Sequence, residues 1–224
     1  MEDAIVLVDK PAGWTSFDVV AKIRGRIRRG YTEQGIKPTK RQLKVGHAGT
    51  LDPFATGLLV VLLGDATKKA TEFLKLDKVY EAEIVLGHES TTGDPEGEIT
   101  AVSSVIPTAE DVHKVLETFV GEIRQRPPIY SAIKINGQRA YDLARKGQEA
   151  VIPVRIVTIY SIELLEYTYP SIKIRTHVGS GTYIRSLAVD TGRALGTGAY
   201  CQALRRTKIA DFDIADAKQI NEVA

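Results

Sequence analysis

The sequence predicts an α+β protein built as a single domain around a mixed, mostly antiparallel central sheet flanked by helices. Three observations lead to this prediction. Leu58 to Leu63 is an unbroken apolar run, as expected of a strand covered on both faces. Lys78 to Leu86 alternates polar and apolar residues, as a half-buried strand does. Val151 to Tyr167 and Ser171 to Val178 are β-branched runs separated by a proline, which indicates an antiparallel pair.

Four main helices are expected around these strands. The first covers residues 17–29, and Thr15 or Ser16 caps it. The second follows Asp65. The third covers residues 108–120 and begins with a sequence that resembles a capping box, and the fourth covers residues 182–195. The first helix carries arginines on its exposed side, and its buried side should be formed by Phe17, Val20, Ile23 and Ile27.

The remaining segments predict shorter elements. Residues 4–8 and 200–209 should be the first and last strands. Asp65 should cap the second helix. Asn136-Gly137 is the strongest hairpin signal, and a short helix is expected after it.

Length and composition limit the classes of protein to consider. The chain has 224 residues, of which 43% are hydrophobic and 26% charged, which is ordinary for a globular protein. No apolar stretch reaches the roughly 20 residues that a membrane span needs, so we expect a soluble cytoplasmic protein. A single cysteine, Cys201, excludes an internal disulfide framework and a cysteine cluster for zinc. The four histidines lack the spacing of metal ligands, so no bound metal is expected.

Charge is distributed unevenly along the chain. Residues 22–46 contain nine basic residues and one acidic residue, a net charge of +8, whereas residues 88–122 contain eight acidic residues and one lysine, a net charge of −7. Residues 30–42 should form a mobile basic loop and residues 88–97 an exposed acidic turn. A basic run is often only a solvated helix face, but this asymmetry would also orient a polyanion on the protein.

The candidate functional segment is the glycine-punctuated loop before the apolar run. Gly49 and Gly57 permit positive φ or close approach of another backbone, and Pro53 favours an extended Asp52. His47 lies five residues before this aspartate. An ordinary turn beside a histidine of the core would explain these residues too. A polar loop joined to a rigid strand is nevertheless a common place for catalytic groups.

Six segments resemble the bacterial TruB-type tRNA pseudouridine synthases. They occur in the same order over nearly the whole chain, and the second is the most specific. They are KPAGWTS (10–16), VGHAGTLDPFATGLL (45–59), DKVYEAEIVLG (77–87), PPIYSAIKINGQRAYDLAR (127–145), GTYIRSLAVDTG (181–192) and LRRT (204–207).

The resemblance implies the pseudouridine synthase fold and isomerisation of uridine 55 in the tRNA T-loop, with no cofactor. It implies that Asp52 is the catalytic carboxylate, acting either as a nucleophile on the ribose or by removing a ribose proton. It further implies that Arg185 pairs with this aspartate and that Tyr80 stacks on the flipped base. Taken singly, Arg185 could instead be a surface charge and Tyr80 a strand aromatic.

The resemblance also implies a set of RNA contacts. His47 would enter the T-loop, and Lys68 and Leu204 would line the site. The other residues expected to bind substrate are Lys10, Gly49, Thr50, Arg28, Arg29, Lys40, Arg41 and Lys44. The expected partner is tRNA, bound through its T-arm and elbow by a monomer with no obligate protein partner.

The expected catalytic domain covers 1–210, with a basic insert at about 30–43. Residues 211–224 should be a short tail, leaving no room for the C-terminal RNA-binding domain of the PUA type that is usual in the family. Two other functions stay open: a guide-RNA-dependent pseudouridine synthase, and an RNA-folding or RNA-binding protein without catalysis.

Overall fold

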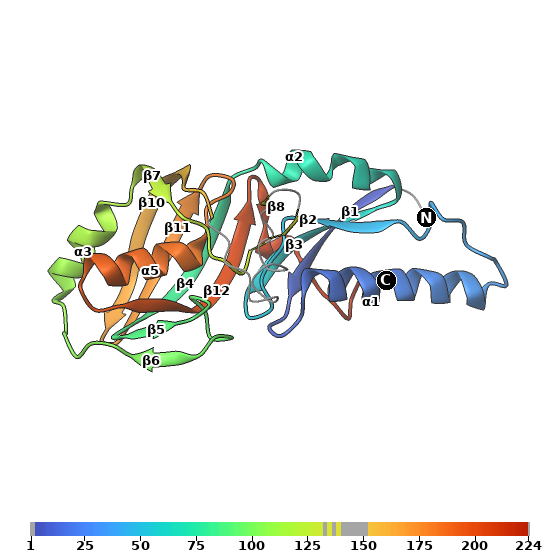
Figure 1. Ribbon diagram of the computed structural model, residues 1–224. Coiled ribbons are helices and arrows are strands. Elements are labelled where there is room, and N and C mark those ends of the chain that lie inside the picture. The colour runs from blue at the N-terminus through green and yellow to red at the C-terminus, as the bar shows by residue number, and fades with distance from the viewer. Residues whose placement is uncertain (1–2, 132–133, 136–137, 140–151, 224) are drawn as a thin grey trace. The chain divides into compact units, whose positions relative to one another are not determined.

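The computed structural model describes residues 3–131, 134–135, 138–139 and 152–223. The chain forms two compact units (Figure 1). Unit 1 contains residues Met1–Tyr80 and Arg205–Ala224, and unit 2 contains Glu81–Leu204. The chain passes between the units within two strands, β4 (Lys78–Leu86) and β12 (Ala199–Ile209).

Unit 1 is a mixed sheet with helices against it. Its strands follow the order β14-β1-β3-β12, with β2 paired to β3 and β13 to β12. β1 and β2 run antiparallel to β3, whereas β12 runs parallel to it. Besides parts of β4 and β12, the elements of unit 1 are β1 (Ala4–Lys10), α1 (Ser16–Glu33), β2 (Val45–Ala48), β3 (Thr56–Leu63), the 3₁₀ helix η1 (Gly64–Lys69), α2 (Ala70–Leu74), β13 (Phe212–Asp213), the 3₁₀ helix η2 (Ile214–Asp216) and β14 (Lys218–Gln219).

β3 is the central strand of unit 1, and both of its faces are covered, as predicted. Leu59, Val61 and Leu63 pack with the buried side of α1. The intervening residues Leu58, Val60 and Leu62 pack with Phe73 of α2 and with Ile209. Figure 1 shows α1 and α2 on opposite sides of the strands. The loop before β3 therefore joins a strand that is packed on both of its faces.

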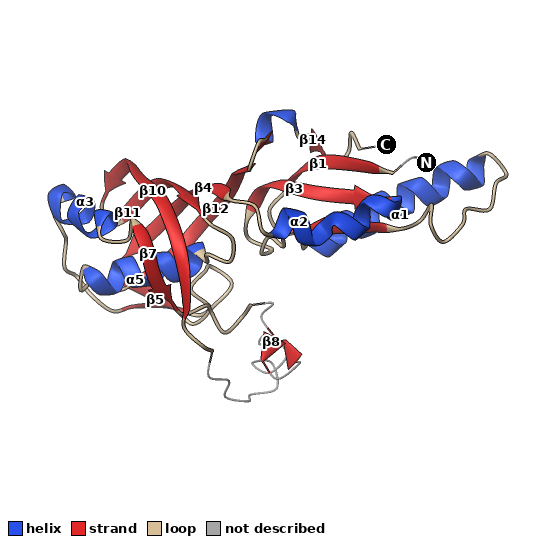
Figure 2. Ribbon diagram, turned by 90° about the horizontal axis from the view of Figure 1, so that it is seen from above, coloured by secondary structure: helices blue, strands red, loops and turns tan. Residues whose placement is uncertain are grey.

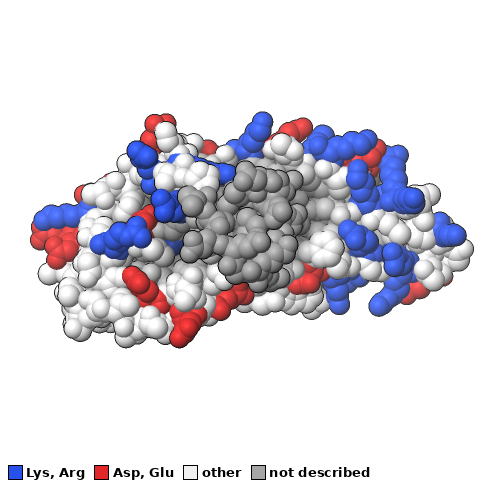
Figure 3. Space-filling model, viewed as in Figure 1, with Lys and Arg blue, Asp and Glu red and all other residues white. Residues whose placement is uncertain are grey.

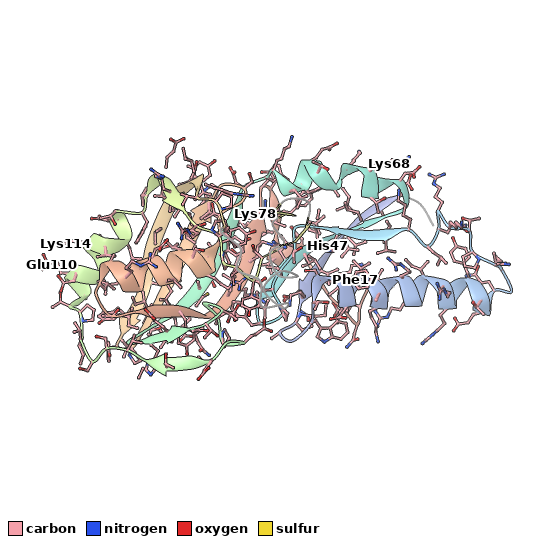
Figure 4. The ribbon with its side chains drawn as sticks, in the orientation of Figure 1. Phe17, His47, Lys68, Lys78, Glu110 and Lys114 are labelled. Atoms are coloured by element: carbon pink, nitrogen blue, oxygen red, sulfur yellow. The ribbon has the colours of Figure 1, made fainter. Side chains whose placement is uncertain are left out.

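The first helix differs from the prediction in two respects. It extends to Glu33, so Gly30 belongs to the helix and not to a loop. Phe17 was expected to be buried but is 62% exposed and points outward (Figure 4). Ser16 takes the inward position because its hydroxyl group bonds to the backbone of Leu51. The predicted cap is confirmed: Thr15 forms a capping box with Asp18.

Unit 2 is also built on a sheet, and strands make up much of it (Figure 2). The strand order is β12-β4-β11-β10-β7, and β10 runs antiparallel to both of its neighbours. α5 lies across one face of this sheet (Figure 1). Besides parts of β4 and β12, the elements are β5 (His88–Ser90), β6 (Ile99–Ala101), α3 (Ala109–Glu117), β7 (Gly121–Gln125), β8 (Lys134–Ile135), β9 (Gln138–Arg139), β10 (Arg155–Thr168), β11 (Ser171–Val178) and α5 (Ile184–Ala194).

Most of the predicted elements of unit 2 are confirmed. β10 and β11 form the expected antiparallel pair. Thr108 caps α3 through a capping box, and an ion pair of 2.7 Å joins Glu110 to Lys114 on the same helix (Figure 4). β8 and β9 pair as the arms of the expected hairpin. The Asn136-Gly137 turn and the helix predicted after it lie outside the described residues.

Two further expectations concern the ends of elements. Asp65 does not cap the second helix, because that helix begins as a 3₁₀ turn without a side-chain cap. The carboxylate of Asp65 forms ion pairs with Arg41 and Lys68 instead. After residue 210 the chain returns along unit 1: β14 pairs with β1, and Ile220 joins the core. The predicted α+β class, with a mixed sheet flanked by helices, is confirmed. Within the described residues, no helix is long and apolar enough to cross a bilayer.

Candidate active site

The candidate catalytic loop, which we define as residues 49–57, runs from the end of β2 to the first two residues of β3 in unit 1. It begins and ends with glycines of positive φ, Gly49 at +93° and Gly57 at +101°. Asp52 lies midway and is partly exposed. The amide of Ala55 donates to the carbonyl of Asp52 at 3.1 Å, which closes a turn immediately after it. The sequence thus places a carboxylate at the tip of a short connection between two paired strands.

The KPAGWTS segment fixes the backbone on both sides of Asp52. On one side, the Ser16 hydroxyl accepts from the amide of Leu51 at 2.9 Å and donates to its carbonyl at 3.2 Å. On the other side, the carbonyl of Pro53 accepts from the amide of Gly13 at 2.8 Å and from Lys10 Nζ at 3.3 Å.

Lys10 itself is fully buried, and its ammonium group also donates to the carbonyls of Pro11 and Trp14. Lys10 was predicted to bind substrate. Its hydrogen bonds to the Pro11, Trp14 and Pro53 carbonyls hold the loop, and a contact of Lys10 with RNA remains a prediction.

His47 belongs to β2 and not to the loop in which the sequence placed it. Burial, and secondarily the positive charge of Arg206, lower the pKa of the imidazole. The ring is therefore neutral at pH 7, since its ordinary value is near 6.5. Its Nδ1 atom is buried and has no hydrogen-bond partner among the described residues. Figure 4 shows His47 beside the strands that carry the loop.

The other candidate residues of unit 1 differ in exposure. Tyr80 lies on the inward face of β4 and is 8% exposed. Lys68 lies on η1, where it is exposed and pairs with Asp65 at 3.2 Å (Figure 4). Gly49 is buried, whereas Thr50 is exposed. A role of these residues in substrate binding stays a prediction.

Arg185, in the first turn of α5, belongs to unit 2 and is not the surface charge that a helix start alone would suggest. Its side chain is 4% exposed and forms an ion pair of 2.7 Å with Asp94, whose side chain is 3% exposed. The guanidinium group also donates to the carbonyls of Thr92 and Tyr130 at 3.2 and 2.7 Å. Hydrogen bonds to a carboxylate and to carbonyls compensate a buried guanidinium for the loss of water. The predicted pairing of Arg185 with Asp52 remains a prediction.

Asp94 was missed in the sequence, where residues 88–97 were expected to be an exposed turn. Its carboxylate also accepts from the Thr92 hydroxyl at 2.5 Å and from the amide of Glu96 at 3.0 Å. The local signal was an aspartate between Gly93 and a proline, which is common in ordinary turns. Only the tertiary contact with Arg185 distinguishes it.

Leu204 is buried on β12 at the end of unit 2, so either a core or a substrate-lining role is compatible with its burial. The predicted basic residues belong to unit 1. Figure 3 shows lysine and arginine side chains gathered over the part of unit 1 that carries α1 and the loop after it. Arg41 forms ion pairs with Asp3 and Asp65. No ion pair within the described residues involves the exposed side chains of Arg28, Arg29, Lys40 and Lys44.

In the part of the chain that the structure describes, no three histidine, cysteine, aspartate or glutamate side chains form a group that could hold a metal ion.

Family comparisons match the chain along most of its length. The profile described as "TruB family pseudouridylate synthase (N terminal domain)" matches residues 37–184. The profile described as "tRNA pseudouridylate synthase B C-terminal domain" matches residues 185–224.

Two relatives carry the name tRNA pseudouridine synthase B. The protein of Dehalococcoides mccartyi is 47% identical over 96% of this chain and 68% of its own length. The protein of Bacteroides fragilis is 48% identical over 95% of this chain and 89% of its own length.

Solved structures with a similar fold include a crystal structure of a Cbf5-Nop10-Gar1 complex, with a TM-score of 0.69 and 30% identity. The match covers 97% of this chain and 52% of that one. A structure of an H/ACA RNP bound to a substrate RNA containing 2′-deoxyuridine gives a TM-score of 0.66 and 28% identity over 97% of this chain and 51% of that one. The chain therefore spans about half the length of these solved chains.

Proposed function

Because the chain belongs to the TruB family of pseudouridylate synthases, we propose that it isomerises uridine 55 in the T-loop of tRNA to pseudouridine. The observation that carries this proposal is the loop of residues 49–57, whose aspartate is held in place by backbone hydrogen bonds on both sides. A carboxylate held in a fixed position is the group that this reaction requires beside the ribose.

The reaction needs no oxidant or reductant. The bond between C1′ and N1 breaks, the uracil turns, and C5 bonds to C1′. The proton leaves C5, and N1 is protonated. In the proposed mechanism Asp52 either attacks the sugar or removes a ribose proton. Both roles require the ionised carboxylate.

Arg185 and Tyr80 are proposed to complete the site. A guanidinium beside Asp52 would stabilise its charged form and fix the direction of its oxygens. The bonds of Arg185 to Asp94 and to two carbonyls keep its side chain in one conformation, which favours such a role. Tyr80 would stack on the flipped uracil and assist removal of the C5 proton.

RNA binding is proposed to combine the basic residues with the histidine of β2. The exposed cations of α1 and the following loop would contact phosphates, which position the RNA. His47, neutral at pH 7, would enter the T-loop at the place that the uridine leaves. Lys68 and Leu204 would contact the target nucleotide. We further propose that the protein acts as a monomer in the cytoplasm.

Tritium release from C5-labelled uridine in an unmodified tRNA transcript tests this function. We expect release with the wild type and none with Asp52→Ala. Release only after a guide RNA is added would support a guide-dependent enzyme instead. Binding of the transcript without any release would identify an RNA-binding protein that lacks catalysis.

A further inference from the structure

Arg206 has a buried guanidinium group in the unit 1 part of β12. The residue is 1% exposed. Its Nε donates to the carbonyl of Leu58 at 2.7 Å, and its Nη2 donates to the carbonyl of Gly49 at 3.0 Å. Among the described residues no carboxylate pairs with it. A buried cation of this kind is retained only where its hydrogen bonds matter to the surrounding structure.

The two carbonyls lie at opposite ends of the catalytic loop. Backbone pairing of β2 with β3 stops at Ala48 and Val60. Beyond that point, the guanidinium group of Arg206 bonds to Gly49 on one side and to Leu58 on the other. A guanidinium has several donors in a fixed planar arrangement, so one side chain can set the separation of both backbone segments. Arg206 thus closes the base of the loop where the strand pairing ends.

Both glycines at the ends of the loop lie against Arg206. A Cβ atom on Gly57 would lie 2.3 Å from the backbone oxygen of Arg206. A Cβ atom on Gly49 would lie 3.4 Å from its Nη1. Both positions also have a positive φ that side chains rarely adopt. Gly57 therefore allows the backbone of β12 to approach closely at Arg206, and Gly49 lies within ordinary contact distance of the guanidinium group.

We infer that Arg206 is a positioning residue for the isomerisation: by bonding to both ends of the loop, it holds the carboxylate of Asp52 in its reactive place. This inference rests on the proposed function, in which Asp52 is the catalytic carboxylate. Arg206 acts through the loop and does not touch the substrate. A lysine would keep the positive charge but lacks the planar arrangement of donors that reaches both carbonyls.

The test compares Arg206→Lys with Arg205→Lys, the same change at the neighbouring residue. The Arg205 guanidinium pairs with Asp9 and makes one longer contact of 3.4 Å with the Thr56 hydroxyl, but it bonds to neither end of the loop. We expect Arg206→Lys to fold, to bind tRNA within about threefold of the wild-type affinity and to lose about 100-fold or more in single-turnover rate, because misplaced catalytic groups cost about this much. Arg205→Lys should keep the wild-type rate. Guanidinium ions at low concentration should restore part of the rate of Arg206→Ala, whereas sodium ions should not.

Hydrogen exchange measures the loop without any need for activity. Amides of residues 49–57 should exchange at least about tenfold faster in Arg206→Lys than in the wild type, and at the wild-type rate in Arg205→Lys. Unchanged exchange, a folded Arg206→Lys with near wild-type rate, or failure of both Arg206 variants to fold would overturn the inference. An inactive wild type whose loop is still loosened by Arg206→Lys would refute the proposed function but keep the structural part of the inference.

Discussion

Replacing Asp94 with asparagine tests the buried ion pair that holds Arg185. Asparagine keeps an oxygen that can accept from the Thr92 hydroxyl and from the backbone amide of Glu96. Its side-chain NH₂ group, however, would replace the carboxylate oxygen that now accepts from Arg185 Nη1 at 2.7 Å, so two donors would face each other. Breaking a buried pair by removing one partner costs about 3–5 kcal/mol. Because two acceptor contacts survive, we expect the lower end, about 3 kcal/mol of unfolding free energy. The Arg185 guanidinium would lose its ion pair with residue 94 and keep its hydrogen bonds to the carbonyls of Thr92 and Tyr130.

Urea denaturation followed by circular dichroism measures this loss. The midpoint should fall by about 1 M or more, given a dependence of about 1–3 kcal/mol per molar urea. Glu81→Gln is the matched control, because Glu81 pairs with Arg175 at 2.9 Å with side chains 39% and 47% exposed, and ion pairs in contact with solvent contribute about 0–1 kcal/mol. Tritium release should fall about tenfold or more in Asp94→Asn and stay unchanged in Glu81→Gln. Equal losses of unfolding free energy in Asp94→Asn and Glu81→Gln would contradict a stabilising role of the buried ion pair.

Three further predictions concern unit 1. Ser16→Ala leaves the buried amide and carbonyl of Leu51 without a partner, so unfolding free energy should fall by about 2–4 kcal/mol and the rate should fall with it; an unchanged melting curve would contradict this. Burial, and secondarily Arg206, lower the pKa of Lys78 to about 8 in the folded protein, against about 10.4 when unfolded. The unfolded chain therefore holds more protons between these values, and the contribution of Lys78 to stability rises with pH from about 8 to 10. Lys78→Met should remove that rise from the difference between the two stability curves, and identical pH slopes would refute the assignment. Lastly, we consider a variant in which Arg28, Arg29, Lys40 and Arg41 are neutralised. The slope of the log–log plot of its tRNA affinity against salt concentration should become less steep by about 0.7–0.9 per lost phosphate contact. An unchanged slope would exclude these contacts.

The sequence predicted those parts of the fold where local pattern and tertiary burial agree. The run Leu58–Leu63 is apolar on both sides, and both sides are buried against separate helices. The alternation in Lys78–Leu86 matches the alternating burial of β4. The prediction that Phe17 is buried was wrong because it rested on the apolar character of the side chain alone. The neighbouring serine took the inward position through two hydrogen bonds to Leu51, which no periodicity records.

The candidate site was predicted through its motif residues, while the residues that hold them were not. Asp94 lies in an acidic, glycine-rich turn, a pattern typical of solvent exposure. It is buried together with Arg185, its ion-pair partner, which belongs to a helix far away in the sequence. Arg206 had a usable signal: it lies two residues after the buried Leu204, so the period of a strand places both on one side. The positive charge of Arg206, however, favours a prediction of exposure, because arginine side chains are rarely fully buried. The carbonyls that accept its hydrogen bonds come from segments about 150 residues earlier in the sequence, and only the fold brings them together.

Mapping of pseudouridine at single-nucleotide resolution tests both the target uridine and the catalytic role of Asp52. An unmodified tRNA transcript is incubated with equal amounts of wild type or Asp52→Asn, and carbodiimide-dependent stops of primer extension locate the product. We expect a stop at uridine 55 with the wild type and none with Asp52→Asn, although the variant should still bind the transcript. Equal stops with both proteins, or wild-type stops only at other uridines, would contradict it.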